Sequence, residues 1–114
     1  MIRHLSLFYA AADLNRAREL FTAALDVEFA AERHLEQTTY LTAELLGGTA
    51  LELWPAGGRP SRVQLEFEVE DLDVVAERLT DAGFEVRQLS GAVLAVDPAG
   101  NTVALISASA RQQT

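Results

Sequence analysis

One sequence pattern occurs twice in the chain, and it is clearest at Val63-Gln-Leu-Glu-Phe-Glu-Val69, followed by Asp71-Leu72. Residues 63–69 alternate between apolar and polar side chains, which is the period of a β-strand with one buried face. After Asp71, apolar residues recur at helical spacing until Gly83, and glycine commonly ends helices. This stretch therefore predicts a strand followed directly by an amphipathic helix.

The first half of the chain opens in the same way. Residues 2–9 read as a strand, and Asp13-Leu14 opens a helical pattern for which Asp13 is the expected N-cap. An offset of 58 residues places Asp13-Leu14 on Asp71-Leu72 and Tyr9 on Phe67. The sequence therefore predicts two related modules, each beginning with a strand and a helix.

Each predicted helix is followed by three short segments that favour strands. These segments are 27–33, 38–46 and 49–54 in the first half, and 85–89, 92–97 and 102–107 in the second. Gly47-Gly48 and residues 97–101 are typical of tight hairpins. We therefore expect an α+β fold made of two βαβββ modules, about 1–55 and about 63–110, joined by a linker at about 55–62 within a single domain, 1–114. The helix covers one face of each sheet, so the two bare faces can form a shared cleft.

Length, charge and cysteine content restrict the function. A chain of 114 residues is one ordinary domain. Its net charge of −8 disfavours nucleic acid and anionic membranes and favours a cationic ligand. Without cysteine there is no disulfide and no thiolate site. No targeting or membrane-spanning segment is visible, so we expect a cytoplasmic protein.

Four stretches together resemble the vicinal oxygen chelate superfamily, which includes glyoxalase I, extradiol dioxygenases, fosfomycin-resistance enzymes and bleomycin-binding proteins. They are Ile2-Arg3-His4-Leu5-Ser6-Leu7, residues 13–21 with 25–27, Asp71-Leu72 with residues 82–86, and the closing Val96-Asp97-Pro98-Ala99-Gly100-Asn101-Thr102-Val103-Ala104-Leu105-Ile106. The resemblance covers nearly the whole chain and implies the same two-module fold. It also implies a homodimer, because short members commonly pair, some by exchanging modules. Asp26 is a departure, since the family usually has glycine there.

The resemblance also implies where a metal would bind, with one ligand from the first and one from the last strand of each module. Aligned through the predicted helix caps, these positions hold Ser6, Glu52, Gln64 and Ala104. Only Glu52 is a convincing metal ligand, because alanine has no donor atom and serine and glutamine are weak, neutral donors. His4 takes the place of Ser6 if the strand register differs by two residues. We therefore expect no metal and no other cofactor.

Alternation along the predicted strands indicates which side chains face the cleft. They combine flat apolar rings with carboxylates, and this mixture suits a planar or cationic organic ligand. The candidate ligand-binding residues are His4, Ser6, Phe8, Tyr40, Glu52, Trp54, Gln64, Glu66, Ala104 and Ile106. Thr42, Glu44, Glu68 and Thr102 are expected on the same faces, and Asp97 and Asn101 are interpreted as turn residues.

No nucleophile and base stand at a catalytic spacing, so no catalytic residue is assigned. The leading hypothesis is a metal-free binding protein for a small molecule, one that sequesters a basic or aromatic antibiotic. The first alternative is a divalent-metal lyase or dioxygenase that uses His4 and Glu52. Two others remain open: an enzyme without metal that uses a cleft carboxylate as general base, and an interaction protein with a vestigial cleft.

Overall fold

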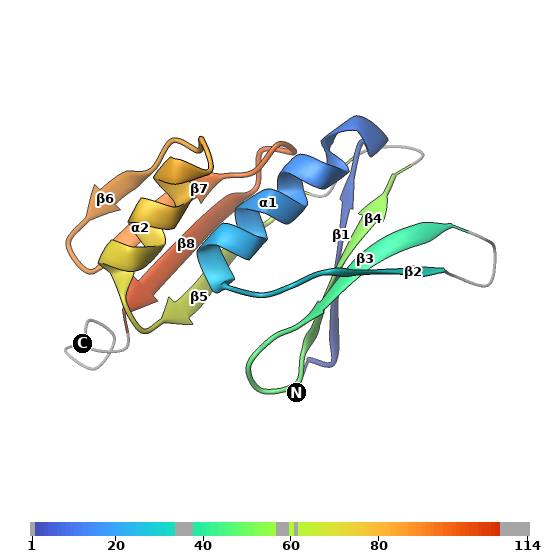
Figure 1. Ribbon diagram of the computed structural model, residues 1–114, viewed down its shortest axis with the longest axis horizontal. Coiled ribbons are helices and arrows are strands. Elements are labelled where there is room, and N and C mark those ends of the chain that lie inside the picture. Colours follow the sequence, from blue (N-terminus) through green and yellow to red (C-terminus); the bar gives the residue numbers. More distant parts are fainter. Residues whose placement is uncertain (1, 34–37, 57–59, 61, 108–114) are drawn as a thin grey trace.

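The computed structural model describes residues 2–33, 38–56, 60 and 62–107, and it has two modules of the same construction (Figure 1). The bounds of the elements follow in chain order. The first module contains β1 (His4–Tyr9), a 3₁₀ turn η1 (Ala11–Asp13), α1 (Leu14–Leu25), β2 (Ala30–Arg33), β3 (Thr39–Glu44) and β4 (Ala50–Pro55). The second contains β5 (Gln64–Val69), α2 (Leu72–Asp81), β6 (Arg87–Leu89), β7 (Ala92–Val96) and β8 (Thr102–Ser107).

The strands form two separate four-stranded sheets with the same topology. Sheet one has the order β1-β4-β3-β2, and sheet two has the order β5-β8-β7-β6. In each sheet the first strand runs parallel to the last, and the other neighbours are antiparallel. The predicted α+β fold of two βαβββ modules is therefore confirmed. In the predicted linker, residues 57–59 and 61 lie outside the described part, as do residues 108–110 at the predicted end of the second module.

One face of each sheet packs against helices, as the alternation predicts. In sheet one, Leu7, Tyr9, Leu51 and Leu53 are fully buried beneath α1. Polar residues between them on the same strands lie on the other face, because successive side chains of a strand point in opposite directions. The hydrophobic pattern therefore determines which face of each sheet is left bare. Among the described residues, no helix is long and apolar enough to cross a membrane.

The connection between first strand and helix differs between the modules, and this corrects two predictions. Four residues, including the η1 turn, separate β1 from α1, whereas only Glu70 and Asp71 separate β5 from α2. The offset of 58 therefore holds for the helices but is wrong for the first strands, where His4 corresponds to Gln64, an offset of 60. Asp13 is also not a side-chain N-cap, because it already has helical dihedral angles at the end of η1. Asp71 is extended instead, and its carboxylate accepts from the N–H groups of Asp73 and Val74.

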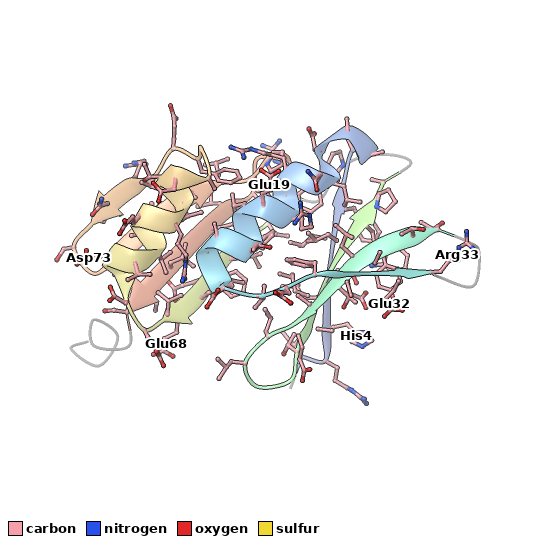
Figure 2. All side chains as sticks on the ribbon, viewed as in Figure 1. His4, Glu19, Glu32, Arg33, Glu68 and Asp73 are labelled. Atoms are coloured by element: carbon pink, nitrogen blue, oxygen red, sulfur yellow. The ribbon has the colours of Figure 1, made fainter. Side chains whose placement is uncertain are left out.

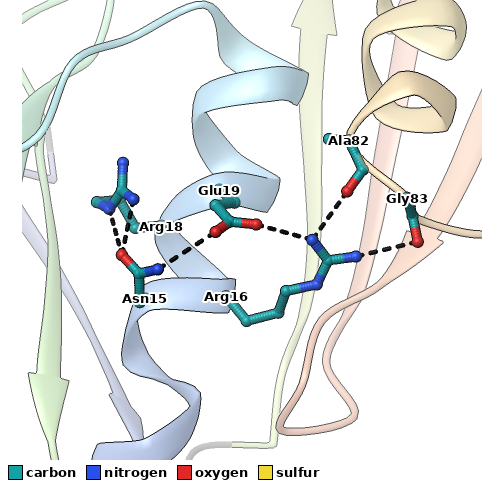
Figure 3. A network of polar contacts seen from close by, with 6 residues as sticks. All are labelled: Asn15, Arg16, Arg18, Glu19, Ala82 and Gly83. Atoms are coloured by element: carbon teal, nitrogen blue, oxygen red, sulfur yellow. Dashed lines mark hydrogen bonds and ion pairs between the residues drawn. The ribbon is translucent and has the colours of Figure 1, made fainter.

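The two modules meet through their helices, which lie side by side in Figure 1. Arg16 of α1 donates to the carbonyls of Ala82 (2.8 Å) and Gly83 (3.0 Å), just past the end of α2 (Figure 3). Its guanidinium also lies 3.6 Å from the centre of the Phe84 ring and pairs with Glu19. Arg78 of α2 donates in return to the carbonyl of Ala23 near the end of α1. A cation is favourable at a helix C-terminus, so each helix stabilises the end of the other.

A buried hydrogen-bond cluster also joins the modules. The Tyr9 hydroxyl at the end of β1 donates to the Asp97 carboxylate in the β7–β8 turn, at 2.6 Å. Asp97 further accepts from the backbone N–H groups of Ala99 and Asn101 and from the Asn101 side chain. The Asn101 side-chain oxygen accepts from the N–H of Val63, just before β5. Asp97 and Asn101 are therefore more than the turn residues that the sequence suggested, because they fix three segments to one another.

Replacing Tyr9 by phenylalanine tests this cluster. Tyr9→Phe removes one donor from a buried carboxylate and should lower the free energy of unfolding by about 1–3 kcal/mol. Urea denaturation measures this change. Tyr40→Phe is the matched control. In the described part of the chain, the Tyr40 hydroxyl makes no hydrogen bond to a buried group, so this variant should change stability by less than about 0.5 kcal/mol.

The same tyrosine gives the cluster a pH dependence. Burial first, and then the hydrogen bond to Asp97, raises the pKa of the Tyr9 phenol well above its ordinary value. Above a pH of about 10 the unfolded chain loses this proton while the folded chain keeps it, so stability should fall as the pH rises. Wild type should lose stability more steeply there than Tyr9→Phe. If the free energy of unfolding fell equally with pH in the two proteins, this role of Tyr9 would be contradicted.

Asp26, the departure from the family pattern, ends α1 in a left-handed conformation with φ 54° and ψ 47°. It is the only described residue other than glycine with a positive φ. Such dihedral angles strain an ordinary side chain but not glycine, which explains the family's preference.

Asp26→Gly should therefore stabilise the protein, by about 0.5–1 kcal/mol after the entropy of glycine in the unfolded chain is included. The lost contact with Arg78 is 4.0 Å long and well exposed, so it offsets little. Asp26→Val provides the opposite control, because a β-branched residue is an outlier in this conformation and should destabilise. The denaturation midpoints of both variants measure the effect, and a lower midpoint for Asp26→Gly would refute it.

Candidate functional site

The face of sheet one that α1 leaves bare gathers six of the ten candidate residues. We call it the sheet-one face, and it presents His4, Ser6 and Phe8 from β1, Tyr40, Thr42 and Glu44 from β3, and Glu52 and Trp54 from β4. Ala30 and Glu32 of β2 extend it to the far edge. Figure 2 shows two of its members, His4 on β1 and Glu32 on β2, which are the edge strands of the sheet. The predicted register of all three strands is therefore confirmed, including that of residues 38–46.

A polar cluster occupies the middle of the sheet-one face. Glu52 is 8% exposed, and its Oε1 atom accepts from the Ser6 hydroxyl at 2.9 Å and from the Trp54 indole N–H at 3.1 Å. Its Oε2 atom lies 3.9 Å from Nδ1 of His4, whose side chain is 66% exposed. The site therefore contains a largely buried carboxylate with a defined orientation.

Three aromatic rings stand in a row beside this carboxylate, and we call them the aromatic row. Tyr40 and Trp54 are stacked, with ring centres 4.1 Å apart and planes 7° from parallel. Phe8 lies on the next strand, with its ring centre 6.4 Å from that of Trp54 and its plane tilted by 30°. The predicted aromatic surface is therefore present, but Tyr40 already covers one face of the Trp54 ring.

The remaining four candidates lie on the bare face of sheet two, which we call the sheet-two face. Gln64 and Glu66 are exposed on β5, and Ala104 and Ile106 belong to the neighbouring β8. Glu66 lies directly opposite Ala104. Glu68 is further along β5 (Figure 2). This face therefore has an acidic edge next to an apolar centre.

The sequence reasoning missed several residues of the sheet-two face. Ala92, Leu94 and Val96 of β7 lie on it, as does Leu89 of β6. Val96 and Leu89 are 60% and 50% exposed, so the apolar part of this face is partly open. The sequence did contain a signal for these residues. The run Ala92–Val96 has no polar residue, which is typical of a strand that is covered on both faces.

The structure thus collects the candidates into two groups, one on each sheet. The two sheets do not pair with each other, and the modules meet instead through α1 and α2 and through the Tyr9–Asp97 cluster. Two surface depressions lie away from both bare faces. One, of about 520 Å³, is lined by α1 and α2 residues that include Arg18, Thr22 and Arg78. The other, of about 250 Å³, lies between α2 and Gln88.

The donor set does not fit a four-ligand metal centre. Corrected for the strand offset, the symmetric positions are His4 with Gln64, or Ser6 with Glu66, each combined with Glu52 and Ala104. Ala104 supplies no donor in either case, and the second-module positions lie on the other sheet. Within the described part of the chain, no group of three or more histidine, cysteine, aspartate or glutamate side chains is placed to hold a metal ion. His4 and Glu52 lie close together on the sheet-one face, with Nδ1 of His4 3.9 Å from Oε2 of Glu52.

The family of the chain follows from its sequence as well as from this architecture. Residues 6–106 match the family model described as a glyoxalase-like domain. Because the match covers most of the chain, the protein belongs to the glyoxalase-like domain family, within the vicinal oxygen chelate superfamily that the sequence resembled. Among curated proteins, none matches the sequence significantly.

Solved structures of the same fold have diverse functions. The glyoxalase/bleomycin resistance protein/dioxygenase domain from Frankia sp. EAN1pec is 26% identical, with a TM-score of 0.69, over 94% of this chain and 96% of that one. The fosfomycin resistance protein FosX from Mesorhizobium loti is 17% identical, with a TM-score of 0.73, over 100% and 98%. TnmS3, an antibiotic-binding protein from Streptomyces sp. CB03234, is 19% identical, with a TM-score of 0.68, over 94% of each chain. Oxidases also share the fold, which therefore does not determine the activity.

The stacking of Tyr40 on Trp54 can be tested with the single tryptophan of the chain. Tyr40→Leu should shift the Trp54 emission to longer wavelength, because the ring loses its cover, and should weaken the near-ultraviolet circular dichroism of the aromatic pair. Phe84→Leu, which changes a ring in the other module, should leave both signals unchanged. Unchanged spectra for Tyr40→Leu would contradict the aromatic row.

Proposed function

We propose that the protein binds a small basic aromatic molecule on the sheet-one face and sequesters it without changing it chemically. The observation that carries this proposal is the largely buried Glu52 carboxylate beside the aromatic row. A buried charge is costly unless an opposite charge or hydrogen bonds compensate it, so the carboxylate favours a ligand that brings positive charge. The rings supply apolar contact area for a flat ligand.

An antibiotic is the ligand class we propose. The net charge of −8 and the carboxylates Glu44, Glu52, Glu66 and Glu68 on the two bare faces favour a basic drug electrostatically. TnmS3, of the same fold, is described as an antibiotic-binding protein, and this supports the class without specifying the compound. Sequestration in the cytoplasm needs no catalytic group, in accordance with the absence of an assigned nucleophile and base.

We further propose that two copies form a homodimer, in which the sheet-two face of one copy closes the sheet-one face of the other. Two features support this arrangement. The edge strands β1 and β5 pair on one side only, and the sheet-two face exposes Leu89 and Val96. A dimer of this kind contains two equivalent composite sites.

The alternative is a divalent-metal enzyme of the lyase or dioxygenase type that uses His4 and Glu52. It is favoured by one observation, the 3.9 Å distance between Nδ1 of His4 and Oε2 of Glu52. The mismatched donor set argues against it, because two strong ligands hold a catalytic metal poorly.

A fluorescence titration distinguishes the two functions. Purified protein is titrated with metal-free bleomycin, with other basic or planar antibiotics, and with Mg²⁺, Mn²⁺, Zn²⁺ and Ni²⁺, while the Trp54 emission is followed. We expect a saturable response to a basic aromatic compound, with one molecule bound per chain, and no response to the metals. Glu52→Gln should weaken that response at least tenfold, whereas Glu28→Gln, the same charge change at an exposed residue between α1 and β2, should not.

A saturable response to a metal alone would overturn the proposal and favour the enzyme. Turnover of a thiohemiacetal, catechol or epoxide by metal-loaded protein would then establish that function. Analytical ultracentrifugation of the same sample tests the dimer independently, because a monomer at micromolar concentration would refute the composite site.

A further inference from the structure

The two oxygens of the Glu52 carboxylate differ in their hydrogen bonding, and this difference indicates which chemical group the ligand must have. Oε1 accepts two hydrogen bonds, from Ser6 and from Trp54. The contact described for Oε2 is His4 Nδ1 at 3.9 Å, which is longer than a hydrogen bond. Ser6 and Trp54 together therefore fix the plane of the carboxylate and leave Oε2 as the atom able to accept from a ligand.

The donor on Trp54 is itself held in place. Its ring stacks on Tyr40 at 4.1 Å, and Phe8 stands on the neighbouring strand. Rotation of the indole away from Glu52 would break this stack, so the position of the N–H group follows from the packing of the row. The carboxylate is thus oriented by groups that are already ordered before a ligand arrives, which lowers the entropy cost of binding.

The stack also restricts how a ligand meets the rings. Tyr40 covers one face of Trp54 and lies too close for a third ring to insert between them, because carbon atoms in contact are about 3.5–4 Å apart and an inserted ring needs that distance on each side. Recognition of a bare cation over the face of an aromatic ring requires an accessible face. With one face of Trp54 taken up by Tyr40, the Glu52 carboxylate that accepts from its indole N–H is the charged group next to the ring, and a charge-assisted hydrogen bond to it recognises a cation more strongly than the remaining ring faces.

From this geometry we propose that Glu52 is the specificity-determining residue of the site, and that its Oε2 atom selects a ligand with a protonated nitrogen bearing at least one N–H. Ser6 and Trp54 are positioning residues that act through Oε1. The site therefore prefers an aromatic ammonium over a neutral alcohol of the same shape, and also over the permethylated ammonium, which has the charge but no N–H. This inference rests on the proposed function and specifies the chemical class of its ligand.

Three probes of one shape test the inference: naphthylmethylammonium, its N-trimethyl analogue and the neutral naphthylmethanol. Their affinities for the protein are measured by ligand-observed NMR at pH 7.5. Wild type should bind the ammonium at least about tenfold more tightly than either of the other two, because only the ammonium makes a charge-assisted hydrogen bond.

The variants separate charge from orientation. Glu52→Gln should abolish the preference for the ammonium. Ser6→Ala and Trp54→Phe, which keep the charge of Glu52, should reduce the ratio of the affinities for the ammonium and for naphthylmethanol about three- to tenfold, because a change in ring contact affects both probes alike and cancels in that ratio. Glu28→Gln is the control for net charge and should retain the full preference. Thermal melts establish that each variant is folded.

A second readout follows the positioning directly. The chain contains one tryptophan and therefore gives one indole N–H resonance in a ¹H–¹⁵N spectrum. That resonance should move upfield, and its hydrogen should exchange faster, in Glu52→Gln, because the acceptor loses its charge. It should move again when the ammonium probe binds to wild type.

The outcomes distinguish the inference from the function on which it rests. If all three probes bind equally, the protein binds aromatic molecules but Glu52 does not select them, and the inference fails alone. Equal binding of the ammonium and the trimethyl analogue likewise overturns the requirement for an N–H. If no probe and no antibiotic of the fluorescence panel binds, the proposed function fails and the inference fails with it.

Discussion

The buried hydrogen bond from Tyr9 to Asp97 is the contact on which the relation between the two modules depends. It joins residues 88 positions apart and carries the end of β1 onto the turn between β7 and β8. Asn101, fully buried, completes the cluster by bonding both Asp97 and the residue before β5. A carboxylate is costly to bury unless donors surround it, and here four donors do so, from both modules. The cluster is therefore satisfied only when the modules are in this arrangement.

The helices complete that arrangement and determine which surfaces remain for function. Arg16 donates to two carbonyls just past the end of α2 (Figure 3), and Arg78 donates to a carbonyl near the end of α1. The layer of helices therefore joins the two modules. Both sheets direct their second faces away from this layer. The same contacts that make one domain from two modules thus leave two bare faces, one aromatic with a buried carboxylate and one apolar with an acidic edge. The candidate site is a consequence of how the modules pack.

On the sheet-one face, the packing of the side chains also affects which type of contact is available to a charged ligand. A tryptophan, a tyrosine and a glutamate on neighbouring strands are compatible with stacking, with cation–π contacts or with hydrogen bonding. Tyr40 stacks on Trp54 and the indole N–H bonds to Glu52, and on this geometry rests our proposal that hydrogen bonding to the carboxylate recognises charge. The family fold alone does not supply this preference, since antibiotic-binding proteins, resistance enzymes and oxidases share it.

The sequence by itself determined the two modules, the order of their elements and the face to which most candidate residues belong. Alternation in 2–9, 49–54 and 63–69 is a local property, because each side chain's direction follows from its position along its own strand. It therefore placed His4, Ser6, Phe8, Glu52 and Trp54 together correctly. Only the tertiary structure decided what depends on register and on turn length. The η1 turn makes the offset between the first strands 60 residues rather than 58. The antiparallel pairing of β3 and β4 brings Tyr40 onto Trp54. Asp97 is buried and accepts a hydrogen bond from the other module, so it is more than a turn residue. Each of these concerns residues distant in sequence, whose separation in space no local period specifies.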